Sequence, residues 1–386
     1  MTTSKKFDAL LVSNPVNIRY LTGFWGANPE EREAYVLLLN NQVYLFTNAL
    51  YLEQAKALTQ RHPDPPVGGE GSSASALRDA SSHQGGTQHD KLKLQLKVVQ
   101  ISREKPLTAV LKELLGSPVK ALSFEETDLT VAELRKLEVE LPQLKLIPVR
   151  NQIETRRMYK HPDELKYIKA AAKLTDECFE YLLGKLKPGI TETELAWEIE
   201  SFFRTQGATS AFSPIVAFNQ NSSFPHYAST TSCKLQANSL LLFDFGASMN
   251  GYCADMTRVI FLGQPTTEQK NVYQAVLAAQ LKALVLLETG ERNGQVLDHE
   301  ARTIIKSANL PTYPHSLGHS LGLAIHEPPR LSEKLETHLK PGMVFTIEPG
   351  VYLQGKFGIR IEDLVYINEK NKLEILSHSP KELLFI

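Results

Sequence analysis

The N-terminal part of the chain alternates short apolar runs with turn-rich gaps such as Ser13-Asn14-Pro15. Apolar residues recur at helical spacing from Tyr51 to Gln60. The short runs have the length and aliphatic content of β-strands, and they cover Ala9–Val12, Tyr35–Leu39, Val43–Phe46 and Leu94–Ile101. Because strands and helices alternate, residues 1–150 are predicted to form an α/β domain.

Residues 62–90 interrupt this pattern. Of these 29 positions, 13 are Gly, Pro or Ser, and the larger aliphatic side chains are those of Val67 and Leu77. A segment of this composition has too little apolar surface to form a core of its own. We therefore expect a flexible insertion within the first domain.

From Glu154 onward, long amphipathic helices dominate. Apolar residues recur at spacings of three and four from Pro162 to Leu186, and Lys187-Pro188-Gly189 then forms a stop signal. Two further helices each begin with a capping box, in which a Thr is followed three residues later by Glu or Gln; these are Thr191/Glu194 and Thr266/Gln269. Strands are predicted over Ser239–Phe245, Cys253–Leu262, Met343–Glu348 and Gly358–Ile367. The pattern predicts an α+β domain over residues 154–386.

Two aspartates stand at a predicted hairpin. Asp244 ends an apolar strand, Asp255 lies 11 residues later, and Asn250-Gly251 favours a tight turn between them. Two like charges held together at apolar strands are costly unless a cation or a proton lies between them. A metal site is therefore one interpretation, but the pair alone is equally compatible with a strand-end Asp and a salt-bridged Asp.

Two glutamates extend this set of acids. Glu348 follows the apolar run Met343–Ile347, and Glu362 lies in a predicted strand whose alternation places it on the same face as Arg360. A structural cluster of Arg and Glu would explain the last pair alone. It would not explain four acids on four separate apolar strands, so the metal interpretation is favoured.

Three histidines lie within 12 residues between the aspartates and the glutamates, at His315, His319 and His326. The first two have the spacing of a helical zinc pair, but Pro314 and Gly318 argue against a helix there. Four carboxylates and an imidazole form an oxygen-rich site that suits Mn²⁺-like ions better than structural zinc. The number of carboxylates suits two ions better than one.

A serine hydrolase is the rival interpretation of the same region. Residues 318–322 fit the motif GxSxG with Ser320 as the nucleophile, and Asp363 and His378 follow in the required order. That motif needs an apolar strand directly before it, and residues 307–314 do not form one. The sequence therefore disfavours this reading.

Charge and composition exclude other classes. Lys and Arg number 42 against 43 Asp and Glu, a net charge of -1, so nucleic acid is not an expected partner. The sequence shows no apolar run long enough for a signal peptide or a membrane span, and its three cysteines form no CxxC pair. We expect a cytoplasmic protein that does not bind membranes.

Taken together, these residues resemble the pita-bread metallopeptidases, and within them the Xaa-Pro peptidases, proline dipeptidase and aminopeptidase P. Asn17–Phe24 and Leu45–Ala55 look like the N-terminal domain of that group. The stretches DxG…D, GHSLG, HExP, IEPG and RIED look like its catalytic domain. The resemblance implies a creatinase-like α/β domain over residues 1–150 and a pita-bread catalytic domain over 154–386. The insertion at 62–90 departs from this pattern.

The resemblance also implies a dinuclear metal site. Asp255 and Glu362 would bridge two divalent ions, expected to be Mn²⁺ with Co²⁺ or Zn²⁺ as alternatives. A hydroxide shared by the ions would attack the bond between an N-terminal residue and proline in a small peptide. The ligands carried over by position are Asp244, Asp255, His319, Glu348 and Glu362. Asp244 would chelate one ion, and His319 and Glu348 would complete the other.

Other residues match the family's functional positions. Glu348 would accept a proton from the attacking water and pass it to the proline nitrogen. His226 and His326 would stabilise the tetrahedral oxyanion, and His315 would line the proline pocket.

Two arginines complete the predicted site. Arg360 would hold Glu362 by a salt bridge, and Arg330 would pair with a substrate carboxylate, which slightly favours dipeptides over longer substrates.

Three other functions stay open. A methionine aminopeptidase shares the metal positions but generally lacks the N-terminal domain. A creatinase-like hydrolase shares both domains but not the metal ligands, and a non-catalytic binding protein of the same fold would have lost those ligands. A homodimer is the expected assembly.

Overall fold

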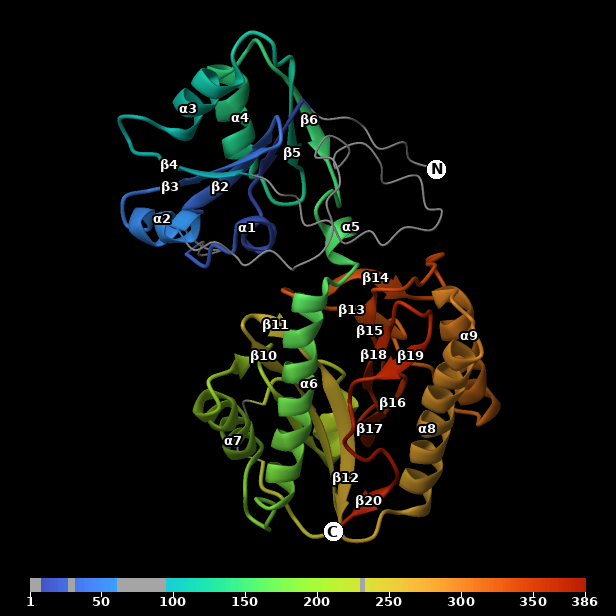
Figure 1. Cartoon of the computed structure of the whole chain (residues 1–386). Helices are drawn as coiled ribbons and strands as arrows, with labels where there is room; N and C mark the ends of the chain where they lie inside the picture. The colour runs from blue at the N-terminus through green and yellow to red at the C-terminus, as the bar shows by residue number, and fades with distance from the viewer. Residues whose placement is uncertain (1–7, 27–31, 61–94, 230–232) are drawn as a thin grey trace. The chain divides into compact units, whose positions relative to one another are not determined.

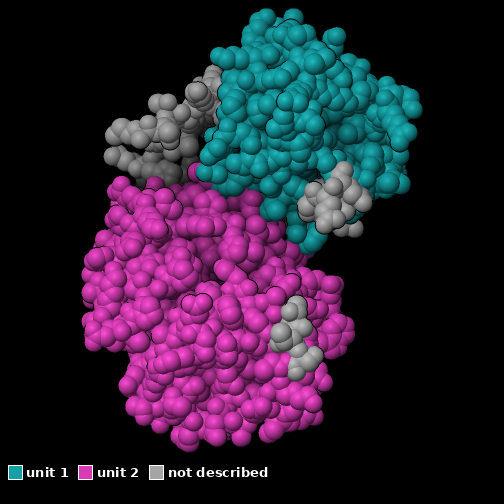
Figure 2. Space-filling view, turned by 180° about the vertical axis from the view of Figure 1, so that it is seen from behind, with its two compact units in different colours: residues 1–154 teal, residues 155–386 magenta. Residues whose placement is uncertain are grey.

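The computed structural model describes residues 8–26, 32–60, 95–229 and 233–386. The chain divides into two compact units, residues 1–154 and 155–386 (Figure 2). The predicted insertion at 62–90 lies outside the described residues. Among the helices described, none has the length and apolar character needed to cross a membrane.

Unit 1 is built on a mixed sheet of six strands in the order β4-β3-β2-β1-β5-β6. Along β1, Ala9 and Leu11 join one hydrophobic cluster while Leu10 and Val12 join another, so both faces of the sheet are covered. The strands are β1 (Ala9–Val12), β2 (Ala34–Leu39), β3 (Gln42–Thr47), β4 (Gln95–Gln100), β5 (Ala121–Glu125) and β6 (Lys145–Val149). The helices are α1 (Pro15–Thr22), α2 (Leu52–Gln60), α3 (Leu107–Leu115) and α4 (Val131–Glu140). This is the α/β arrangement predicted from the sequence.

The long helices of unit 2 begin where the sequence predicts. Thr191 and Thr266 both form complete capping boxes, with Glu194 and Gln269 respectively. The short helix α5 (Glu154–Arg157) leads into this unit. Its long helices are α6 (Pro162–Leu183), α7 (Glu192–Thr205), α8 (Thr267–Glu288) and α9 (Gly294–Ser307).

The strands of unit 2 form two larger sheets and two small ones. One sheet has the order β20-β12-β9-β8 and the other β14-β13-β15-β18-β19. The strands of the first are β8 (Ile215–Phe218), β9 (Ser239–Phe245), β12 (Met256–Leu262) and β20 (Leu384–Phe385). Those of the second are β13 (Gly318–Ser320), β14 (Glu327–Leu331), β15 (Val344–Ile347), β18 (Asp363–Ile367) and β19 (Leu373–Ile375). The small sheets comprise β7 (Thr209–Ser210), β10 (Ala247–Met249) and β11 (Tyr252–Cys253), and β16 (Gly350–Leu353) with β17 (Phe357–Arg360).

Helices cover the central strands of unit 2 from two sides, with α6 and α7 on one side and α8 and α9 on the other (Figure 1). Strand β9 contains the apolar run of residues 240–243, whose side chains are buried on both faces of the sheet. Leu241 and Phe243 pack in the cluster that includes α6 and α7, whereas Leu240 and Leu242 pack in the cluster that includes α8 and α9. A strand buried on both faces favours a near-continuous apolar run, and Asp244 near its end is the charged exception.

The predicted hairpin is confirmed. Strands β9 and β12 pair antiparallel with Asp244 opposite Thr257, and Asn250 and Gly251 form the turn between β10 and β11 with φ values of 48° and 75°. A Cβ atom at Gly246 would lie 1.8 Å from the carbonyl oxygen of Ala254. Glycine therefore lets the two arms approach closely next to Asp244 and Asp255.

Two predicted strands are divided in the structure. The strand expected over Cys253–Leu262 is broken between β11 and β12 at Ala254 and Asp255, and that over Gly358–Ile367 is broken between β17 and β18 at Ile361 and Glu362. Both breaks fall at predicted metal ligands. The apolar pattern of a segment does not indicate the residue at which the backbone stops pairing with the neighbouring strand.

Candidate metal centre

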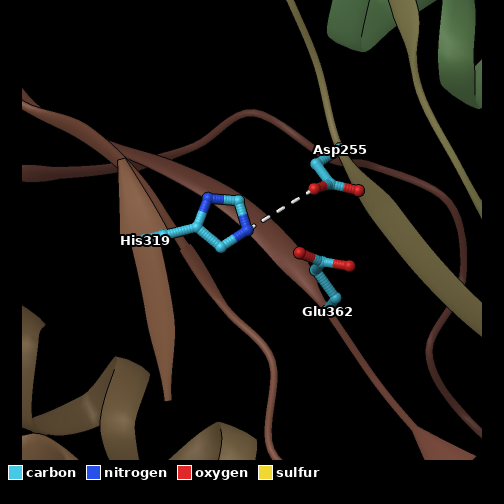
Figure 3. A group of neighbouring side chains, drawn as sticks. All are labelled: Asp255, His319 and Glu362. Carbon is cyan, nitrogen blue, oxygen red and sulfur yellow. Dashed lines mark ion pairs between the residues drawn. The ribbon is translucent and has the colours of Figure 1, made fainter. Parts of the chain in front are cut away.

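Three of the predicted ligands meet in one buried group. Asp255, His319 and Glu362 each offer a ligand atom, and these atoms all lie within 4.8 Å of one another. They come from the β11–β12 junction, from β13 and from the β17–β18 junction, and their side chains point into a common space (Figure 3). His319 Nε2 lies 3.7 Å from Asp255 Oδ2.

The other two predicted ligands adjoin this group. Glu348 directly follows β15, and its Oε1 atom lies 3.4 Å from His319 Nε2. Asp244 is buried near the end of β9. After burial itself, the charges of Glu362, Asp244 and Glu348 all raise the pKa of Asp255. The four carboxylates therefore act electrostatically as one group.

A close strand contact aligns His319 with Glu348. A Cβ atom at Gly318 would lie 1.9 Å from the carbonyl oxygen of Thr346, so glycine lets β13 approach β15. The Thr346 hydroxyl then accepts a hydrogen bond from the His319 N–H at 3.1 Å and donates one to Glu348 Oε1 at 3.1 Å. The glycine before the histidine is thus part of the site.

His319 is held in the form that binds a metal. Its Nδ1 lies 3.1 Å from the carbonyl oxygen of Ser320, which can only accept, so Nδ1 carries the proton. Burial and the neighbouring His326 lower the pKa of His319 to about 4, so the ring is neutral at pH 7. The Nε2 lone pair therefore faces the carboxylates.

The electrostatics of the group fit a divalent cation. Among the described residues, Asp255 Oδ1 and Glu362 Oε1 are buried carboxylate oxygens without a hydrogen-bond donor. Burial and the charge of Asp244 raise the pKa of Glu362 to about 7, and burial and the charge of Glu362 raise that of Glu348. A cation between them would both coordinate the unpartnered oxygens and offset the repulsion.

The partner of Arg360 differs from the prediction. Arg360 forms an ion pair with Asp244 rather than with Glu362. Thr257 links it to Glu362 by hydrogen bonds, since Thr257 Oγ1 accepts from Arg360 Nε at 2.9 Å and donates to Glu362 Oε2 at 2.7 Å. Glu362 lies beyond the end of β17, so the two-residue alternation does not continue from Arg360 to Glu362.

Sequence reasoning missed two residues of this network, Thr257 and Tyr352. Thr257 follows Asp255 by two positions, and strand alternation is a signal that could have identified it. Tyr352 carried no local signal, because its role depends on contacts across the fold. Its hydroxyl lies 3.0 Å from His315 Nε2 and accepts from Arg360 Nη1 at 2.6 Å. Burial and the charge of Arg360 lower the pKa of His315 to about 3, so its ring is neutral.

The remaining predicted residues lie at the rim of the group. His226, His326 and Arg330 are exposed, and the ring centroids of His326 and His319 are 4.5 Å apart. Arg330 stands opposite His319 in the β13–β14 pairing. Burial, the charge of Arg330 and the charge of His226 each lower the pKa of His326. The rings of His226 and His326 therefore interact electrostatically.

The serine hydrolase reading finds no support in the structure. Ser320 is buried within strand β13, not in a turn from a strand to a helix. Asp363 accepts hydrogen bonds from Arg258 at 2.7 Å and from Gln280 at 2.7 Å, and His378 is exposed.

The chain is similar to peptidases along nearly its whole length. A model of the creatinase/prolidase N-terminal domain matches residues 2–159, and one of metallopeptidase family M24 matches residues 166–369. An uncharacterised peptidase from Bacillus subtilis is 32% identical over 381 residues, which are 98% of this chain and 96% of that protein.

Two solved structures agree with this similarity. An Xaa-Pro dipeptidase from Bacillus anthracis has a TM-score of 0.81 at 30% identity, covering 98% of this chain and 95% of that one. An X-Pro aminopeptidase from Thermotoga maritima has a TM-score of 0.79 at 29% identity, covering 98% of both chains. The chain belongs to metallopeptidase family M24, with a creatinase-type N-terminal domain ahead of a pita-bread catalytic domain.

Proposed function

We propose that the protein is a metal-dependent peptidase that cleaves the bond between an N-terminal residue and proline. The observation that carries this proposal is the buried group of Asp255, His319 and Glu362, whose unpartnered carboxylate oxygens fit a cation. The substrate class is supported by two solved relatives, an Xaa-Pro dipeptidase and an X-Pro aminopeptidase.

The proposed site holds two divalent ions, and its oxygen-rich ligand set suits Mn²⁺. When bound, such ions lower the pKa of a water molecule to about 7 and so supply a nucleophile at neutral pH. The residues that would hold them are Asp244, Asp255, His319, Glu348 and Glu362.

Glu348 is the proposed proton carrier. Its side chain is partly accessible, and burial and the charge of Glu362 raise its pKa above the ordinary value of a glutamate, which favours uptake of a proton. The nitrogen of an Xaa-Pro bond is a tertiary amide without an N–H group, and its departure requires protonation. Glu348 would deliver that proton.

Three histidines are proposed to orient the substrate. His226 and His326 stand at the exposed rim, where a ring N–H can donate to the developing oxyanion. His315 is fixed between the carbonyl oxygen of Ser316, 2.8 Å from its Nδ1, and the Tyr352 hydroxyl. Its neutral ring would pack against the proline of the substrate.

Arg330 is proposed to recognise the carboxylate of a dipeptide. It is exposed beside His319 and can form a bidentate ion pair with a free C-terminus. This would favour dipeptides slightly over longer peptides. The homodimer and the cytoplasmic location stay predictions.

Product analysis tests the proposed function. The Mn²⁺-treated protein is incubated with Ala-Pro, Ala-Pro-Ala and Met-Ala-Ala together, and the products are identified by mass spectrometry beside a sample treated with EDTA. We expect release of alanine from at least one of the two proline peptides, and we expect EDTA to block it. The length of the peptide that is cleaved faster distinguishes a dipeptidase from an aminopeptidase. Release of methionine alone, or of nothing, would contradict the Xaa-Pro assignment.

A further inference from the structure

His226 depends on its backbone for its position. Within the described parts of the chain, its ring takes part in no hydrogen bond or ion pair, and the side chain is exposed. It follows strand β8 and the 3-10 helix η1 (Asn219–Ser223). A ring that must aim a donor at a reacting oxygen therefore needs this segment to be fixed.

A buried carboxylate fixes the segment from one side. Glu192, the first residue of α7, is fully buried. Its Oε1 atom accepts from the Phe218 N–H at 2.7 Å and from Asn221 Nδ2 at 2.9 Å, and its Oε2 atom accepts from the Tyr227 hydroxyl at 2.8 Å. Asn221 Nδ2 also lies 3.0 Å from the Tyr227 hydroxyl. One side chain thus ties the start, the middle and the end of the segment.

Strand β17 fixes the segment from another side. The Gly358 N–H donates to Ser222 Oγ at 2.8 Å, and a Cβ atom at Gly358 would lie 2.0 Å from the carbonyl oxygen of Ser222. Arg360 Nη1 donates to the carbonyl oxygen of Pro225 at 3.2 Å. On the other side of His226, the Tyr227 hydroxyl bonds Glu192, and Ser229 Oγ accepts from the Val216 N–H at 2.8 Å. The bond to Glu192 is the one of these two that lies next to His226 in the chain.

We infer that Tyr227 and Glu192 are positioning residues for His226. The inference rests on the proposed function, in which His226 stabilises the oxyanion. The Tyr227 hydroxyl and the Glu192 carboxylate touch neither substrate nor metal in this scheme. They hold the backbone that places the His226 ring, and they act on the reaction only through that ring.

A double-mutant cycle tests this coupling. Tyr227→Phe keeps the aromatic ring and removes the hydroxyl, and a loss of about 10- to 100-fold in kcat with a much smaller change in KM is expected on an Xaa-Pro peptide. In a His226→Ala background, the same substitution is expected to change kcat less than about twofold. An equal loss in both backgrounds would show that the hydroxyl does not act through His226, and the inference would fail.

Tyr181→Phe is the matched control. It removes another tyrosine hydroxyl that hydrogen-bonds a glutamate of α7, Glu198, away from the His226 segment. The control is expected to keep kcat and KM of the unmodified protein. A kcat loss in the control equal to that of Tyr227→Phe would also overturn the inference, because the effect would then belong to the helix and not to His226.

Hydrogen exchange separates the inference from the proposed function. Peptides that cover residues 218–227 are expected to exchange faster in Tyr227→Phe than in Tyr181→Phe, and equal rates would overturn the anchoring. If the unmodified protein releases no alanine from either proline peptide, the proposed function fails. The exchange rates then still decide whether Tyr227 anchors the segment.

Discussion

Asp255 and Glu362 each present one buried carboxylate oxygen without a hydrogen-bond donor among the described residues. In a protein interior such an atom is expensive unless a cation or a proton is nearby. Single substitutions at these two positions therefore test the proposed metal binding separately from folding.

Asp255→Asn is expected to lower turnover of an Xaa-Pro peptide by at least about 10²-fold, because a neutral amide cannot supply the charge that holds the ions. The fold is expected to remain, since the amide has the same shape. Turnover, bound metal by mass spectrometry and circular dichroism measure the three quantities. Full activity with full metal content would contradict the assignment of Asp255 as a ligand.

Glu362→Gln is expected to raise the Tm of the metal-free protein at pH 8. The folded-state pKa of Glu362 is about 7, raised by burial and the charge of Asp244, and it lies above the unfolded value of about 4.3. The folded state therefore binds this proton more tightly, and stability is lost as pH rises between these values. Calorimetry in EDTA is expected to show a higher Tm for the variant than for the unmodified protein at pH 8, and a smaller difference in Tm at pH 5. If the variant were less stable than the unmodified protein by the same amount at both pH values, ionisation of Glu362 would not be the source of the destabilisation.

At the scale of elements, the site depends on places where backbones touch. Gly246 lets the β9 arm approach Ala254, and Gly318 lets β13 approach β15. Each glycine lies within two residues of a predicted ligand. The geometry of the proposed metal centre is thus set partly by residues that carry no side chain.

Gly246→Ala is expected to destabilise the protein by about 3 kcal/mol or more, because its Cβ atom would lie 1.8 Å from the Ala254 carbonyl oxygen and the hairpin must shift. Bound metal is expected to fall with it. Gly184→Ala is the control, since Gly184 has a right-handed φ of -72° and its nearest atom lies at 3.4 Å. Denaturant unfolding of both variants measures the difference, and equal stabilities would contradict the close approach.

Much of this architecture was predictable from local pattern. The capping boxes at Thr191 and Thr266 and the Asn-Gly hairpin appear as expected, because each depends on residues within a few positions of one another. The convergence of Asp255, His319 and Glu362 followed from the resemblance to a family whose motifs lie far apart in the chain.

The remaining features depend on contacts between distant segments. Arg360 pairs with Asp244, 116 residues earlier, and no local alternation could identify this partner. The same holds for Glu192 and Tyr227, which are 35 residues apart and meet only in the folded protein. The strand breaks at Asp255 and Glu362 were not predicted, because tertiary contacts can interrupt strand pairing at any residue.

At the scale of the whole molecule, the metal group found among the described residues lies entirely in unit 2. A divalent ion that binds this group would stabilise the folded state by mass action. It also competes with protons, because the carboxyl pKa values of Asp255, Glu348 and Glu362 are raised. The stabilisation by metal should therefore depend on pH, and it should be larger in unit 2 than in unit 1.

Mn²⁺ is expected to raise Tm more at pH 8 than at pH 5.5, and EDTA is expected to reverse the increase. Hydrogen exchange with and without Mn²⁺ is expected to show added protection in peptides from residues 155–386 and little change in those from 1–154. Protection confined to the first unit would place the metal elsewhere.

The four clustered acids also bear on how such a sequence can change over generations. In a chain selected only for folding, replacing Asp255 or Glu362 by a neutral residue of the same shape would relieve the repulsion among the four acids, and random substitution would be expected to find it. Asp244, Asp255, Glu348 and Glu362 are all present, although each adds repulsion to the others. The presence of all four in one chain is what selection for an activity, and not for folding alone, would be expected to leave.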